Sequence, residues 1–105
     1  MSRVSIYKVC LRGDGLRVLE EGGEVTWGFF KNEYIRAPDI RSATAIAKAR
    51  VKRALSVNSA VQKDSIEDIL FTIEGVDSGV SVWRLLNNEG FVFYDSNDSD
   101  HEADA

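Results

Sequence analysis

The chain has 105 residues, of which 44% are hydrophobic and 29% are charged, and these proportions are ordinary for a soluble globular protein of one domain. One cysteine and one histidine exclude an intramolecular disulfide and a zinc site of the usual four-ligand kind. The first residues lack the apolar core of a signal peptide, and no apolar run is long enough to span a membrane. We therefore expect a cytoplasmic protein without a membrane partner, metal or cofactor.

The formal net charge of −4 comes from the C-terminal segment. Residues 95–105 hold five of the 17 acidic residues and no lysine or arginine, so residues 1–94 carry 12 acids against 13 bases. We predict one α+β domain over residues 1–94 and a disordered acidic tail over 95–105, because the tail cannot bury enough apolar surface to order itself. His101 lies in this tail, where we expect a solvated segment rather than a metal site.

The N-terminal part of the chain predicts a meander of short strands. Apolar residues predict a first strand over Val4–Leu11 and a short strand over Leu16–Leu19. Residues 13–15 (Gly-Asp-Gly) and 21–24 (Glu-Gly-Gly-Glu) are typical of turns, because glycine tolerates positive φ.

An aromatic strand follows from Val25 and ends before Pro38. At the two-residue period of a strand its large rings divide between the faces, with Trp27 and Phe29 on one and Phe30 and Tyr34 on the other. Gly28, between two large rings, indicates a bulge or a close approach of another backbone.

Pro38 blocks continuation of this strand, and Asp39 or Ser42 can serve as the N-cap of a helix. A helix is predicted over Asp39–Ser56, because apolar residues recur at steps of three and four. That apolar face comprises Ile40, Ala43, Ile46, Ala47, Val51, Ala54 and Leu55. The other sides are basic, and Arg41, Lys48 and Lys52 share one face.

The C-terminal part predicts a strand over about Asp68–Val76 and a last strand over Phe91–Tyr94, while Val80–Leu86 suits either a strand or a short helix. The predicted fold class is α+β: a mostly antiparallel sheet of four or five strands with the Asp39–Ser56 helix across one face. A ferredoxin-like arrangement is the alternative, and it requires a second helix near Val80–Leu86.

Four short motifs carry a resemblance to known proteins. They are Tyr7-Lys8-Val9, Gly28-Phe29-Phe30, Tyr34-Ile35-Arg36-Ala37 and Gly90-Phe91-Val92-Phe93-Tyr94. With the alanine-rich helix between them, they resemble a group of small bacterial proteins of unknown function. The resemblance spans most of the chain ahead of the tail, supports the fold class and implies no activity.

The sequence favours an interaction module over an enzyme. We find no histidine or cysteine partner that could form a nucleophile–base pair with a serine of residues 1–94, and neither glycine-rich segment matches a phosphate-binding loop. The aromatic residues exceed what one helix can cover, so we expect self-association as a homodimer or binding to another protein. The candidate interaction residues are Trp27, Phe29, Phe30, Tyr34, Phe91 and Phe93.

Two other functions remain open at this point. The basic helix over residues 41–53, with Arg41, Lys48 and Lys52, could contact the phosphates of a nucleic acid. The acidic tail suggests an inhibitor or decoy protein of phage or host origin.

Overall fold

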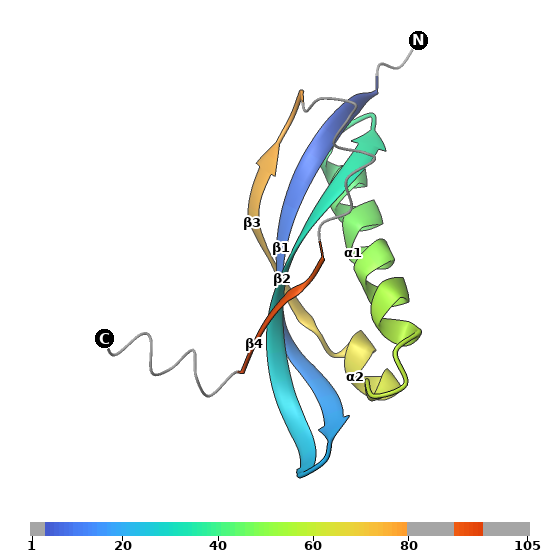
Figure 1. Cartoon of the computed structure of the whole chain (residues 1–105). Coiled ribbons are helices and arrows are strands. Elements are labelled where there is room, and N and C mark those ends of the chain that lie inside the picture. Colours follow the sequence, from blue (N-terminus) through green and yellow to red (C-terminus); the bar gives the residue numbers. More distant parts are fainter. Residues whose placement is uncertain (1–3, 80–89, 96–105) are drawn as a thin grey trace, which may run out of the picture.

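The computed structural model describes residues 4–79 and 90–95 (Figure 1). The described elements are β1 (Ser5–Glu20), β2 (Gly23–Ala37), α1 (Ile40–Ser56), α2 (Lys63–Glu67), β3 (Leu70–Asp77) and β4 (Val92–Asp95). The strands form one open antiparallel sheet in the order β3-β1-β2-β4. This architecture confirms the predicted α+β class with one main helix packed on the sheet.

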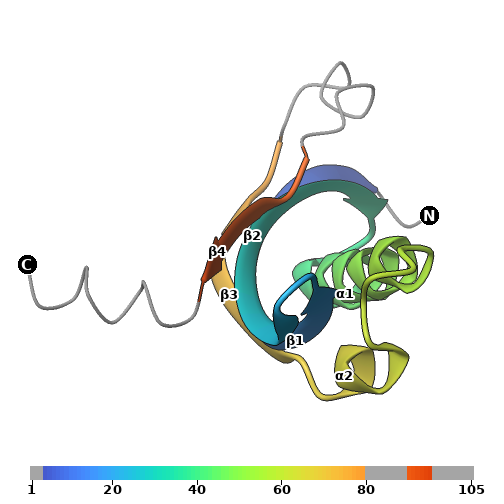
Figure 2. The same ribbon diagram turned by 60° about the horizontal axis from the view of Figure 1, so that its bottom comes forward.

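The sheet curls around α1, so that one of its faces is concave and holds the helix (Figure 2). The helix buries one narrow stripe against that face, made of residues four apart: Ala43, Ala47, Val51 and Leu55. Alanine side chains at two of these positions let the helix backbone lie close to the strands. The opposing core residues include Tyr7, Val9, Leu11, Leu16, Phe29 and Ile35. This packing places the hydrophobic core between α1 and the centre of the sheet.

The buried face of the helix is narrower than the sequence predicts. Ile40 is 54% exposed, Ile46 is 37% exposed, and Ala54 also faces solvent. The concave sheet touches the helix from one side only, so apolar residues displaced from that stripe stay at the surface. Asp39 is the N-cap, and its carboxylate accepts a hydrogen bond from the Ser42 N–H at 2.7 Å.

The predicted turn at residues 13–15 is wrong, because β1 continues through it. The register against β2 shifts between Gly13 and Leu16, which marks a β-bulge, and Gly15 adopts a φ of +93° there. Pairing with β2 on one side and β3 on the other keeps the chain extended across these residues. The reversal occurs only at residues 21–22, where the second predicted turn is confirmed.

The ferredoxin-like alternative does not describe this topology. β1 and β2 form an antiparallel hairpin before α1. A ferredoxin-like order places a helix between the first two strands. The segment Val80–Leu86 and residues 96–105 of the predicted tail lie outside the described residues, so the predictions made for them stay predictions. Asp95, the first residue of the predicted tail, is instead the last residue of β4. In the part of the chain that is described, no helix is long and apolar enough to cross a membrane.

The short helix α2 was not predicted. The sequence predicts a strand from about Asp68 and no helix between the main helix and that strand. The segment between the two helices instead pairs with β1 through an isolated bridge between Val18 and Val61. This bridge holds the segment between the helices against β1 and brings α2 beside the β1–β2 hairpin (Figure 1).

Candidate functional site

A row of aromatic rings crosses the concave face of the sheet. Phe29 is fully buried, and its ring makes edge-on contacts with Phe71, Phe91 and Phe93 at centroid distances of 6.3, 5.4 and 6.2 Å. Gly13 lies directly opposite Phe29 on β1, and a Cβ at Gly13 would overlap the Phe29 ring. The absence of a side chain at Gly13 therefore lets a ring from β2 reach across β1 to a ring from β3.

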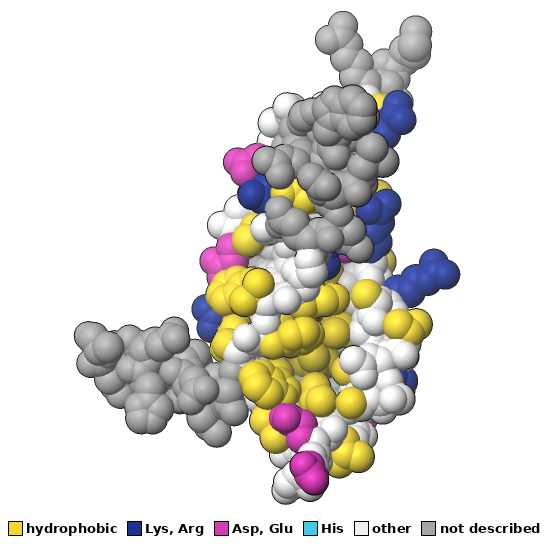
Figure 3. Space-filling view, viewed as in Figure 1, with side chains coloured by type: hydrophobic (Ala, Val, Ile, Leu, Met, Phe, Trp, Pro, Cys, Tyr) yellow, Lys and Arg dark blue, Asp and Glu magenta, His cyan; other side chains and the backbone are white. Residues whose placement is uncertain are grey.

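Beside this row lies an apolar groove with a volume of about 420 Å³. The hairpin forms one wall, the end of α1 and the loop after it form the second, and β4 contributes a ring at the edge. The lining residues are Leu16, Val18, Leu19, Glu20, Trp27, Leu55, Asn58, Ala60, Val61 and Phe93. Hydrophobic side chains gather on the face of the molecule shown in Figure 3. We call this feature the hairpin groove.

Two residues make the hairpin groove accessible from solvent. Leu19 is 57% exposed and Phe93 is 47% exposed, whereas Trp27 is half-buried in the wall. The Trp27 indole N–H donates a hydrogen bond to Glu20 Oε2 at 3.0 Å. This bond satisfies the polar atom of the indole and holds its ring in one orientation, so the wall is largely formed before anything binds.

Backbone hydrogen bonds hold the second wall against the hairpin. The Leu19 N–H donates to the Ala60 carbonyl at 2.8 Å, and the Gln62 N–H donates to the Arg17 carbonyl at 2.9 Å. These bonds flank the Val18–Val61 bridge and place the loop after α1 along the edge of β1. The groove therefore exists because β1 continues past the end of β3 and pairs there with the loop that follows α1.

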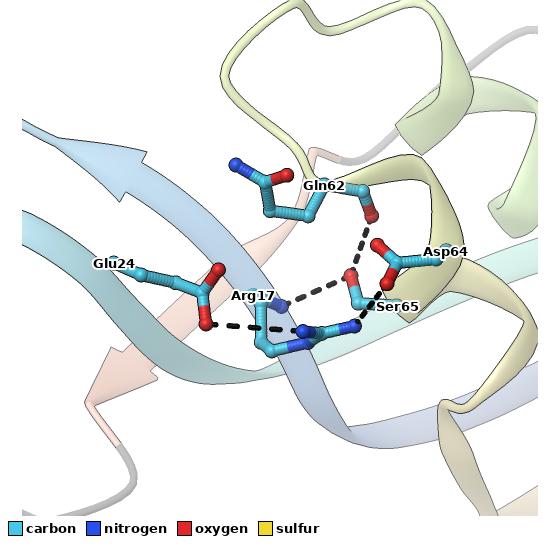
Figure 4. Close-up of polar contacts among 5 residues, drawn as sticks. All are labelled: Arg17, Glu24, Gln62, Asp64 and Ser65. Carbon is cyan, nitrogen blue, oxygen red and sulfur yellow. Dashed lines mark hydrogen bonds and ion pairs between the residues drawn. The ribbon is translucent and has the colours of Figure 1, made fainter.

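Side chains of α2 reinforce the same junction (Figure 4). The Ser65 hydroxyl, which is fully buried, accepts a hydrogen bond from the Arg17 N–H at 3.1 Å and donates one to the Gln62 carbonyl at 2.6 Å. The Arg17 guanidinium donates to Asp64 at 2.8 Å and lies 3.8 Å from Glu24. The hydrogen bond from Arg17 lowers the pKa of Asp64, and the same bond raises the pKa of Arg17.

The convex face of the sheet carries a separate polar cluster that ties β4 to β1. The Tyr94 hydroxyl accepts a hydrogen bond from Arg12 Nε at 2.9 Å and donates one to Asp14 Oδ1 at 2.5 Å. The Arg12 guanidinium lies 5.5 Å from the Tyr94 ring and 5.8 Å from the Phe30 ring. Burial, followed by the hydrogen bond to Asp14, raises the pKa of Tyr94.

The bulge predicted at Gly28 is confirmed, although the extra residue lies on β1 and not on β2. The register between β1 and β2 shifts opposite Gly28, between the pairs Gly13–Phe29 and Leu16–Trp27, and a Cβ at Gly28 would overlap the ring of Tyr94. The absence of a side chain at Gly28 therefore leaves room for the Tyr94 ring to pack against the convex face of the sheet. Gly13 serves the same purpose for Phe29 on the concave face.

The structure separates the predicted aromatic interaction residues into four groups. Phe29 and Tyr34 are buried, Trp27 and Phe93 line the hairpin groove, and Phe91 is partly buried against the core. Phe30 is 37% exposed on the convex face, away from the groove. Sequence reasoning did not identify the aliphatic walls of the groove, because Leu16, Val18 and Val61 are typical of any half-buried segment.

The basic helix residues do not join the groove. Lys52 lies 3.5 Å from Glu67 of α2, whereas Arg41 is exposed and Lys48 is half-buried without an ion pair among the described residues. The described residues also contain no group of three or more histidine, cysteine or acidic side chains that could hold a metal ion. The use of Arg41, Lys48 and Lys52 for nucleic acid stays a prediction.

Comparisons with protein families, with curated proteins and with solved structures find no match to this chain. The resemblance to small bacterial proteins therefore stays a prediction as well.

Proposed function

We propose that this protein is a small non-enzymatic interaction module that binds another protein through the hairpin groove. The observation that carries the proposal is an open, apolar hollow of about 420 Å³ with Leu19 and Phe93 exposed at its rim. Large exposed apolar surfaces bordered by polar residues are typical of protein interaction sites. Trp27 adds a rigid aromatic ring of the type that contributes strongly to binding.

The geometry of the groove supports a protein partner. Its walls come from secondary structure held by backbone hydrogen bonds, so little conformational entropy is lost when a ligand enters. Its volume suits a few side chains of a bound segment and is within the range of ligand pockets. The rim offers Glu20 and Asn58 as polar contacts that could fix the orientation of that segment.

Selection of peptides from a random display library on the full chain tests this proposal. We expect the wild-type protein to enrich peptides with apolar side chains, and Leu19→Ser and Phe93→Ser to lose them. Leu70→Ser is the matched control, because Leu70 is an exposed strand leucine, 73% accessible, that does not line the groove. Failure to enrich any peptide, or equal enrichment on all four proteins, would contradict the proposal.

Self-association through β4 is a second candidate. Val92 is 64% exposed, Val92–Tyr94 carry no charge, and the outer edge of β4 pairs with no other strand in the described parts of the chain. The opposite edge strand, β3, instead has a register shift against β1 and the charged residues Glu74 and Asp77, which discourage edge pairing. Static light scattering across a concentration series tests this candidate. Dimerisation that Val92→Lys abolishes supports it, and a monomer at every concentration refutes it.

A further inference from the structure

The hairpin groove ends at an acidic turn. Residues 18–26 contain three acidic residues and no basic one, and all three (Glu20, Glu21 and Glu24) are exposed. Glu20 also lines the groove, so the acidic turn and the apolar walls form one continuous surface. Figure 3 shows acidic side chains at the hairpin end of the molecule, next to the hydrophobic surface.

Nearby basic groups do not neutralise this turn. The guanidinium of Arg17 lies 2.8 Å from Asp64 and 3.8 Å from Glu24, so its charge is shared between two carboxylates. Lys63 directs its ammonium group to the Asn58 carbonyl at 2.6 Å, at the opposite wall. Glu20 and Glu21 have no ion pair among the described residues and leave a local excess of negative charge.

We propose that the partner of the hairpin groove is a protein segment that places apolar side chains in the groove and lysine or arginine against Glu20 and Glu21. This inference rests on the proposed function and adds the chemistry of the partner to it. Complementary charge at the rim of an apolar contact favours the correct partner and speeds association. Leucine-rich segments with basic flanks fit this surface, and segments with acidic flanks are repelled by it.

The same charge argues against two other occupants. An anionic membrane surface would face the carboxylates of the turn, and that approach is electrostatically unfavourable. The C-terminal residues 96–105 of this chain have four acidic residues and no lysine or arginine, with only alanine as an apolar residue. Neither their charge nor their side chains complement the groove.

Fluorescence anisotropy with two labelled synthetic peptides tests the inference on the full chain. Both peptides share one leucine face, and their polar positions are lysine in the first and glutamate in the second. We expect the lysine peptide to bind at least tenfold more tightly, and added salt to reduce that difference. Glu20→Gln combined with Glu21→Gln should weaken the lysine peptide about three- to tenfold, since exposed ion pairs are individually weak.

A variant with Asp98→Asn and Asp100→Asn is the matched control, because it removes the same charge from the C-terminal tail. Equal effects of the two double variants would overturn the inference, as would equal binding of the two peptides. If Leu19→Ser abolishes binding of both peptides while they bind the wild type equally, the groove binds but the basic flank is wrong. If Leu19→Ser affects neither peptide, the proposed function itself fails. The circular dichroism spectrum and thermal midpoint of each variant establish that it is folded.

Discussion

Replacing Gly28 with alanine should destabilise the protein, because the added methyl group would occupy space that the Tyr94 ring fills. A Cβ at Gly28 would lie closer than 3.0 Å to three atoms of Tyr94, which side chains in proteins essentially never do. The ring must therefore move away from the sheet. Its hydroxyl then loses Arg12 and Asp14, and its ring loses Phe30, which lies 5.4 Å away.

The expected loss of unfolding free energy follows from these contacts. Hydrogen bonds to charged groups contribute about 1.5–3 kcal/mol, and the lower end applies because Arg12 and Asp14 are 38% and 35% exposed. The pair of aromatic rings adds about 0.5–1.5 kcal/mol. Alanine offsets about 0.4–1 kcal/mol by restricting the unfolded chain. With two such bonds, the net loss of unfolding free energy is about 3 kcal/mol, which lowers the thermal midpoint of a domain of this size by about 12–24 °C.

Urea unfolding followed by circular dichroism measures this loss, and Gly75→Ala is its control. Gly75 also lies within a strand, but a Cβ there meets no atom within 4 Å, so we expect no loss of stability. The same Gly28→Ala change in a Tyr94→Ala background should be neutral or slightly stabilising, because the ring is already gone.

Two outcomes would refute this reasoning. If Gly28→Ala costs as much in the Tyr94→Ala background as in the wild type, the cause is the backbone of β2 and not the ring. If Gly28→Ala leaves the wild-type midpoint unchanged, the Tyr94 ring does not lie on this glycine in solution.

Two further predictions concern the junctions that hold α1 and α2. Ser65→Ala should lower the unfolding free energy by about 1–3 kcal/mol in urea titrations, because a buried hydroxyl that bonds Arg17 and Gln62 is lost; no change would mean that water replaces it. Asp39→Ala should lower the thermal midpoint at neutral pH, whereas Asp39→Asn retains the cap. The hydrogen bond from the Ser42 N–H lowers the pKa of Asp39 below its ordinary 3.8, so its stabilisation is complete above that pH and is lost as pH falls through the folded-state pKa. The melting curves of wild type and Asp39→Ala should therefore converge in acid, and a gap independent of pH would contradict this assignment.

Local chemistry explains the parts of the fold that were predicted correctly. Pro38 ends β2, Asp39 caps α1, and the glycines at residues 22–23 reverse the chain, and each effect depends on neighbouring residues only. The α+β class follows from the same signals, because one amphipathic helix among apolar strands must cover a sheet. The candidate residues Trp27 and Phe93 were identified as aromatic residues in excess of what the helix could cover, and the groove accounts for both.

Glycine positions separate the local signals from those that depend on tertiary structure. Residues 13–15 have the composition of a turn, yet β1 passes through them because strands pair with it on both sides. Gly13 and Gly28 look alike in sequence, but rings from distant parts of the chain cover them on opposite faces. A sequence does not specify which ring will arrive, since that depends on strand register across the sheet.

The sequence by itself determined where the main helix and the hairpin turn begin and end, which residues are apolar, and where the acidic residues cluster. Only the tertiary structure decided that Phe29 is sealed in the core while Leu19 and Phe93 remain at an open groove beside the acidic turn. The physical reason is that burial depends on which surfaces meet. Because the sheet curls around α1, the helix covers the centre of the sheet and does not cover the end of the hairpin near its turn.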